Sequence, residues 1–171
     1  RLRSRGLGDV YKRQVDGPLD LRLNPEAGVP AAKRLAELDE DEIVGMLVEN
    51  SDEPYAEQIA AQIMRERKRK HAIDTTTALR QVIEKALEFL PEAERREMVK
   101  KSCQRTFQAL RIDVNSEFEV LDAFLSKLPG ILAPGGRVAI LTFHSGEDRM
   151  VKKYFKQMEK DGIYSLSLIH I

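Results

Sequence analysis

Apolar residues recur every three or four positions through the middle of the chain, a spacing that places them on one face of an α-helix. This spacing predicts a short helix around Leu35 and a second helix around Leu47. It predicts a third helix over residues 55–70 and a fourth over residues 75–90, which Asp74 would cap. The middle of the chain is therefore predicted to form a helical unit without strands.

The pattern changes beyond the fourth helix. A short charged helix is predicted to begin at Pro91, followed by a longer amphipathic helix over residues 104–127. The Pro-Gly-Gly sequence of residues 134–136 is typical of a turn, and the apolar run over residues 138–143 predicts a buried strand. A last helix is predicted over residues 147–158. A helix, a turn and a strand in this order are half of a βαβ unit, which favours an α/β fold.

Leucines alternate with polar residues near the start of the chain. Leu19, Leu21 and Leu23 are separated by Asp20 and Arg22. Alternation of this kind predicts an extended segment with one buried face. An ordinary loop anchored by apolar side chains is the alternative.

Composition narrows the possible classes of protein. A length of 171 residues allows one domain, or one domain with a small insertion. Lys+Arg and Asp+Glu both number 28, so any surface for nucleic acid must be local. The single cysteine, Cys103, rules out an internal disulfide and fits a reducing compartment. No apolar run approaches the roughly 20 residues of a membrane-spanning helix, and no secretory signal is visible. We therefore expect a cytoplasmic protein that is not embedded in a membrane.

The two ends of the chain differ from the rest. Residues 1–14 have no clean periodicity, and residues 165–171 follow the last helix abruptly. We expect both segments to be non-native sequence that flanks an internal fragment of a longer protein.

Two polar residues are candidates for chemistry because they follow the predicted strand directly. His144 and Ser145 lie where ligands bind in open α/β sheets, beyond the carboxyl end of a strand. The alternative is a plain strand end, with Ser145 as a helix cap. A hydrolase is disfavoured, because neighbouring residues on a strand point to opposite sides. No metal site is expected, because His71, His144 and Cys103 lack metal-ligand spacing.

A run of cations ends the third predicted helix. Cations suit a helix C-terminus, where they form a solvated face. The alternative is a patch that contacts a phosphate backbone, since the run holds more cations than a helix end needs. The residues are Arg65, Arg67, Lys68, Arg69 and Lys70.

Three strings of residues carry a resemblance to a known family. VDGPLDLRL, RTFQALRIDVNSEFEVLDAFL and LAPGGRVAILTFHSGEDRMVKKYF resemble the bacterial ribosomal RNA small subunit methyltransferase H family, in the expected order over residues 15–164. The resemblance implies a class I methyltransferase that uses S-adenosylmethionine to methylate the N4 amine of a cytidine in 16S rRNA. The small ribosomal subunit would be its partner, with no role for DNA.

This resemblance also implies a division into domains. Residues 15–25 and 104–164 would belong to a partial Rossmann-like α/β core, and residues 26–103 would form an all-α insertion that recognises substrate, so that this chain is mostly helical. The family's glycine-rich cofactor loop precedes Asp16. No cofactor-binding residue is therefore assigned, and we expect the chain alone to be inactive and not to bind S-adenosylmethionine.

Methyl transfer to an exocyclic amine needs a positioned base and acceptors for the amine's hydrogen bonds. His144 and Ser145 are candidates to line the base pocket, and Asp16 is a candidate acceptor for the amine. Arg105 and Arg111 are candidates for phosphate contact. Asn115 is a candidate to bond either a base edge or the backbone of the turn after Asp16. For each, a purely structural role is the alternative.

Two positions depart from the family pattern. Gly146 stands where the family usually has Leu, and Lys101-Ser102 stands where it usually has His-Pro. Glycine at this corner is expected to loosen it and to remove an apolar contact. A non-catalytic helical module that binds RNA or protein is the alternative function.

Overall fold

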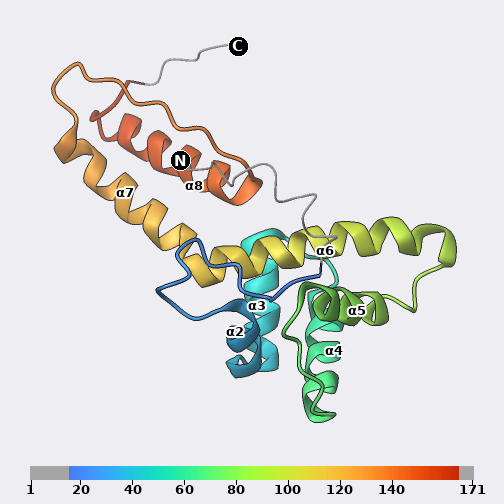
Figure 1. Ribbon diagram of the computed structural model, residues 1–171. Coiled ribbons are helices and arrows are strands. Elements are labelled where there is room, and N and C mark those ends of the chain that lie inside the picture. Colours follow the sequence, from blue (N-terminus) through green and yellow to red (C-terminus); the bar gives the residue numbers. More distant parts are fainter. Residues whose placement is uncertain (1–15, 166–171) are drawn as a thin grey trace. The chain divides into compact units, whose positions relative to one another are not determined.

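The computed structural model describes residues 16–165 of the chain, and these residues are mostly helical (Figure 1). The end segments predicted to be non-native lie outside the described residues, apart from Ser165. In the described part, the helices are α2 (Ala31–Glu37), α3 (Glu40–Ser51), α4 (Ala56–Lys68), α5 (Thr76–Ala86), α6 (Glu92–Asn115), α7 (Glu117–Ile131) and α8 (Ser145–Lys160).

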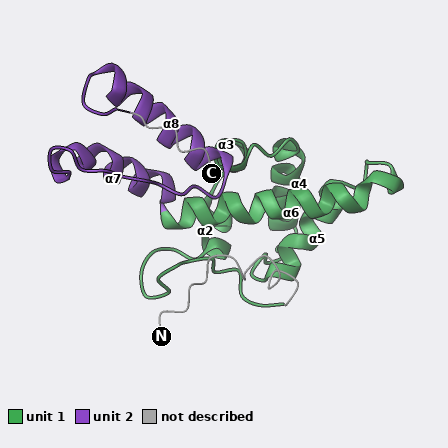
Figure 2. Cartoon of the chain, turned by 90° about the horizontal axis from the view of Figure 1, so that it is seen from above, with its two compact units in different colours: residues 1–115 green, residues 116–171 purple. Residues whose placement is uncertain are grey.

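The chain divides into two compact units at Asn115 (Figure 2). In the first unit α3 packs against α4 and α6, while α5 packs against α4 and α6. Apolar faces of these helices meet in one core. Its fully buried side chains include Ile43, Leu47, Ile59, Ile63, Leu79 and Ile83. In the second unit α7 packs against α8, with Leu125, Leu128 and Val151 buried.

The helices predicted for the middle of the chain are confirmed, with one correction to a cap. Asp39 caps α3, because its side chain accepts from the amide of Glu42 while the Glu42 side chain accepts from the amide of Asp39. The predicted cap of the fourth helix, Asp74, is wrong. Thr75 caps α5 instead, because its hydroxyl accepts from the amide of Ala78 at 3.0 Å.

The boundary between the next two predicted helices is also wrong. The charged helix after Pro91 does not stop before Gln104 but continues to Asn115 as the single helix α6. The interruption comes at Ser116, whose backbone is left-handed with a φ of 48°. The predicted boundary between insertion and core, at residues 103–104, thus falls inside α6. The assignment of functional domains stays a prediction.

The segment after Asp16 is only partly the extended strip that its leucines predict. Leu19 is buried and its amide donates to the carbonyl of Asp74 at 2.8 Å. Leu21 is half-buried, however, and Leu23 is 71% exposed. The reason is a change of backbone direction, since Leu21 is left-handed with a φ of 62°. The alternative of a loop with apolar anchors describes the segment better.

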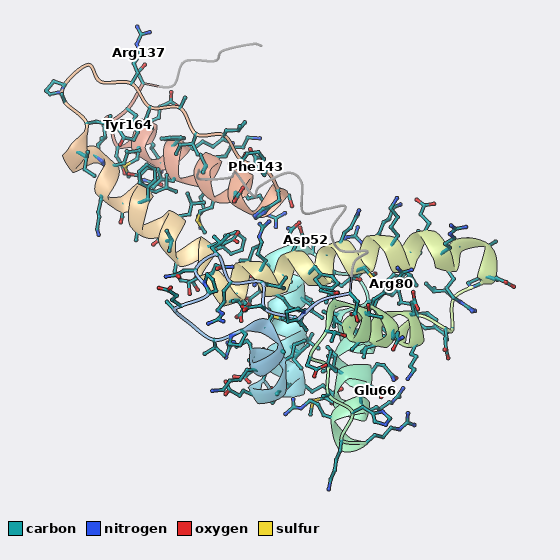
Figure 3. All side chains as sticks on the ribbon, viewed as in Figure 1. Asp52, Glu66, Arg80, Arg137, Phe143 and Tyr164 are labelled. Carbon is teal, nitrogen blue, oxygen red and sulfur yellow. The ribbon has the colours of Figure 1, made fainter. Side chains whose placement is uncertain are left out.

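The predicted buried strand over residues 138–143 is wrong for the described part of the chain. These residues form no strand, and Leu141 and Phe143 are 79% and 70% exposed. Phe143 lies in the stretch that leads into α8 (Figure 3). A strand requires a neighbouring backbone to satisfy its amides and carbonyls, and no other described segment pairs with this one. The expected Rossmann-like sheet is therefore absent from residues 16–165.

None of the helices in the described range is both long enough and apolar enough to span a membrane.

The corrected cap of α5 makes a testable prediction. We expect Thr75→Ala to lower the free energy of unfolding by about 1 kcal/mol, because the amide of Ala78 loses its acceptor. Asp74→Ala is expected to change the free energy by less than about 0.5 kcal/mol, as for an ordinary surface substitution. Urea denaturation of both variants measures this. A larger loss for Asp74→Ala than for Thr75→Ala would contradict the assignment.

Candidate nucleic-acid interface

The cation run lies where α4 ends and the chain turns. Lys70 is left-handed with a φ of 59°, and its amide donates to the carbonyl of Arg67 at 2.9 Å. The amide of His71 donates to the carbonyl of Glu66 at 3.0 Å. These two bonds close the helix in the arrangement known as a Schellman motif. The run is therefore divided between the last turn of α4 and the turn that follows it.

The turn is held by a buried acidic residue, Glu66. Glu66 lies near the C-terminal end of α4 (Figure 3), and its side chain is only 4% exposed. Its carboxylate accepts from Gln62 at 2.9 Å and from Lys85 of α5 at 3.2 Å, and lies 2.7 Å from Nδ1 of His71. The hydrogen bonds from His71 and Lys85 lower the pKa of Glu66 to about 2, so it is ionised at neutral pH.

The five cations differ in what they contact. Arg65 donates to the side chain of Gln62 at 3.3 Å, and Arg67 donates to the carbonyl of Leu38. Arg69 lies 3.8 Å from Glu66 and is 63% exposed. The run is completed by Lys68 and Lys70. Within residues 16–165 no ion pair or side-chain hydrogen bond involves either lysine, so their ammonium groups reach solvent without giving up a protein contact.

A cleft of about 300 Å³ opens beside the same turn. Its apolar wall comes from α2 and from the connection between α4 and α5, while its charged and ionisable groups come from the end of α4 and the turn. The lining residues are Ala32, Leu35, Ala36, Arg67, Lys70, His71, Ala72 and Ile73. The cation run thus borders a concave surface with apolar walls.

Asn115 holds the loop after Asp16 against the end of α6. Its side-chain oxygen accepts from the amide of Leu23 at 2.8 Å, and its nitrogen donates to the carbonyl of Leu21 at 3.0 Å and to that of Arg111 at 2.7 Å. These contacts lie just beyond the turn over residues 16–20 that the second predicted role names, so both predicted roles of Asn115 stay predictions. A base-edge contact would require this amide to leave its partners.

The other predicted site residues of the first unit are scattered. Arg105 and Arg111 are half-buried on α6, and Asp16 is exposed at the start of the described range. The predicted pocket would combine Asp16 with His144, which lies in the second compact unit. That combination stays a prediction.

His144 and Ser145 do not follow a strand in the described residues, and that part of their assignment is wrong. His144 is the N-cap of α8, and its Nδ1 accepts from the amide of Glu147 at 3.4 Å. Ser145 is the first residue of the helix, so the alternative of Ser145 as the cap is also incorrect. The side chain of His144 is 9% exposed and its ring lies against Phe118 with centroids 5.8 Å apart.

Two carboxylates near His144 form with it a possible group of metal ligands, which the spacing of His and Cys residues in the sequence does not reveal. The ligand atoms of Glu117, His144 and Glu147 lie within 4.8 Å of one another. Nδ1 of His144 accepts the capping hydrogen bond, however, so the proton of a neutral ring lies on Nε2. A protonated Nε2 is not available as a metal ligand. In the described residues this nitrogen lies 3.4 Å from an oxygen of Glu147 without a hydrogen bond to it.

The two departures from the family pattern have structural explanations. At Gly146, an added Cβ would lie 2.6 Å from Cζ of Phe118, so glycine admits the close approach of this ring. The corner is therefore filled rather than loosened. Ser102 is fully buried on α6, and its hydroxyl donates to Glu53 at 2.9 Å. Each departure thus accommodates a specific neighbour.

Sequence reasoning missed Glu66, although a signal was present. Glu66 continues the apolar spacing of Ile59 and Ile63, which places it on the buried face of α4. An acid on a buried face, within a run of cations, indicates an internal ion-pair network.

Comparison with known proteins gives consistent matches along the chain. The MraW methylase family matches residues 2–168, a range that extends into both end segments expected to be non-native. The chain is 64% identical over 155 residues to Ribosomal RNA small subunit methyltransferase H 1 of Lachnoclostridium phytofermentans, covering 91% of the chain and 42% of that protein. It is 62% identical to the protein of the same name from Agathobacter rectalis, covering 91% and 44%. Identity to Ribosomal RNA small subunit methyltransferase H of Thioalkalivibrio sulfidiphilus is 43%, covering 82% and 43%. The chain therefore spans less than half the length of these relatives.

The buried acid Glu66 is expected to make the stability of the fold depend on pH. The folded pKa of Glu66 is about 2 and its ordinary value is 4.5, so its contribution to stability is present above pH 4.5 and is lost as the pH falls toward 2. We expect Glu66→Gln to lower the free energy of unfolding by about 1–3 kcal/mol at pH 7, because hydrogen bonds to a charged group are lost. This difference from the native chain should shrink steadily in acid.

Glu49→Gln, an exposed position on α3, is the matched control. Denaturation of the three proteins between pH 7 and pH 2 measures the effect. A difference between Glu66→Gln and the native chain that stays constant over this range would contradict the ion-pair account.

Proposed function

The chain belongs to the MraW methylase family, and from this we propose that the whole protein transfers a methyl group from S-adenosylmethionine to the N4 amine of a cytidine in 16S rRNA. The observation that carries this proposal is the 64% identity over 155 residues to a relative named for methylation of small-subunit ribosomal RNA. The sites of cofactor and base binding follow as further parts of the same proposal.

S-adenosylmethionine would supply the methyl group. The described residues do not fit its binding loop, because Gly135 and Gly136 lie in a turn between α7 and a stretch that is neither strand nor helix, and so do not join a strand to a helix. We propose that the residues that hold S-adenosylmethionine lie in the part of the protein that this chain does not span.

We propose that this chain contributes to the recognition of the rRNA, mainly through the end of α4. Lys68 and Lys70 are exposed, and their charges are not used by described neighbours. Arg69 adds a third exposed cation at the same turn. Phosphates of RNA bind such groups by releasing condensed counterions, so affinity depends on salt. Arg65 and Arg67 would act mainly by fixing the turn, since both donate to protein acceptors.

A second candidate function is a non-catalytic RNA-binding module. The first compact unit favours it, because this unit has its own apolar core and contains the whole cation run. The two candidates differ in whether a methylated base appears.

A methylation assay tests the first proposal. The protein of the full gene is incubated with S-adenosylmethionine and small ribosomal subunits that lack the modification, and the digested 16S rRNA is analysed by mass spectrometry. We expect N4-methylcytidine at one position. With folding unchanged, a loss of rate of more than about tenfold in His144→Ala would support His144 as a residue that positions the base, and an unchanged rate would contradict that role. Binding of the subunit without any methylated cytidine would favour the non-catalytic alternative.

Charge removal at the end of α4 tests the role of this surface. We expect Lys68→Gln with Lys70→Asn to weaken binding of single-stranded RNA by about tenfold at low salt. The slope of log K against log[salt] should fall by about 1.4, since each phosphate contact to a single strand contributes about 0.7. Asn is chosen at position 70 because it tolerates the left-handed backbone there.

Lys127→Gln with Lys153→Gln, two exposed lysines of α7 and α8, is the matched control. Fluorescence polarisation over a range of salt concentrations measures both variants. Equal affinities and equal slopes for the two double variants would show that the cation run is only a solvated helix end.

A further inference from the structure

The cleft beside the end of α4 combines two chemistries in one concavity. Leu35 is 2% exposed and Ile73 is half-buried, so the interior of the cleft is apolar. Three nitrogen-bearing side chains also line the cleft, and these are Arg67, Lys70 and His71. A ligand that satisfies both parts needs an apolar body joined to a negative group.

Two of the nitrogen-bearing groups are held in place before any ligand arrives. Arg67 donates to the carbonyl of Leu38, and the same nitrogen lies 3.2 Å from Sδ of Met64. Nδ1 of His71 lies 2.7 Å from the carboxylate of Glu66. Side chains that are already ordered lose less entropy on binding, so they favour a defined ligand geometry. Lys70, in contrast, has an exposed ammonium group and no described partner to give up.

Acidic groups near the cleft do not oppose an anion strongly. The charge of Glu66 is balanced by Lys85 at 3.2 Å and by Arg69 at 3.8 Å. Glu37, which follows Ala36, lies 3.7 Å from Lys33. The balance of charge around the cleft therefore favours a negative ligand.

We propose that this cleft receives one unstacked nucleotide of single-stranded RNA, with its base against Leu35 and Ile73 and its phosphate at Lys70. The proposal rests on the proposed function, because it names how the rRNA is held. A volume of about 300 Å³ suits one nucleotide. Sequence-specific recognition of RNA targets single-stranded segments, whose unstacked bases can be splayed out, whereas bases within a duplex are stacked and inaccessible.

Filling the cleft tests the proposal without changing any charge. Ala36 is exposed and lines the cleft, so Ala36→Trp is expected to occupy it without disturbing the core. Ala93→Trp, at an exposed position of α6 outside the cleft, is the control. We expect Ala36→Trp to weaken binding of a short single-stranded RNA by about tenfold, because one base loses its apolar contacts in the cleft. The salt slope should not change, because the phosphate contacts remain.

A titration with three different compounds distinguishes the possible ligands. Amide chemical shifts of the labelled chain are followed during titration with cytidine monophosphate, inorganic phosphate and an acidic peptide. Shifts at Ala32, Ala36 and Ala72 with the nucleotide alone support a base in the cleft. The proposal is overturned if inorganic phosphate or the acidic peptide moves the same amides equally, or if Ala36→Trp binds RNA like Ala93→Trp. Methylation of 16S rRNA by the full protein does not depend on this result. Nucleotide binding in the cleft can therefore be contradicted while the proposed methyltransferase function is still supported.

Discussion

A buried carboxylate sets the geometry of the surface that we propose contacts RNA. Glu66 lies on the inner face of α4, where an unpaired charge would be costly. Lys85 of α5 and His71 of the following turn supply the partners that keep it ionised. One ion-pair network thus joins two helices and fixes the turn between them. The cation run keeps its position because this network holds the end of α4.

The same network explains why neighbouring cations have different roles. Arg65 is bonded to Gln62, which also donates to Glu66, so its position is tied to the buried acid. Lys68 and Lys70 are outside the network and present their charge to solvent. The turn that displays Lys70 also forms one wall of the cleft. An internal ion-pair network therefore supports an exposed cationic edge beside an apolar hollow, and this is the surface at which we propose that single-stranded RNA binds.

Local patterns were enough to predict the helices whose apolar spacing is unbroken, such as α3 and α4. Features that depend on distant residues were not predictable in this way. The break after Asn115 reflects side-chain bonds to Leu21 and Leu23, which are more than 90 positions earlier. The run over residues 138–143 has the composition of a strand, but a strand exists only where a second backbone pairs with it. The described residues supply none.

For the candidate interface, the sequence located the cations but not their roles. Arg67 looks the same as Lys68 in a charge pattern, yet it is committed to the carbonyl of Leu38, which is brought near by the packing of the first unit. The cleft combines α2 with the turn after α4, and no local pattern connects them.

We expect the end of α4 and the turn after it to contact rRNA in the full protein. Zero-length photo-cross-linking of the full protein to the small ribosomal subunit, with the cross-linked peptides identified by mass spectrometry, tests this contact. We expect cross-links within residues 65–73. Cross-links confined to α7 and α8, with none in this range, would contradict it.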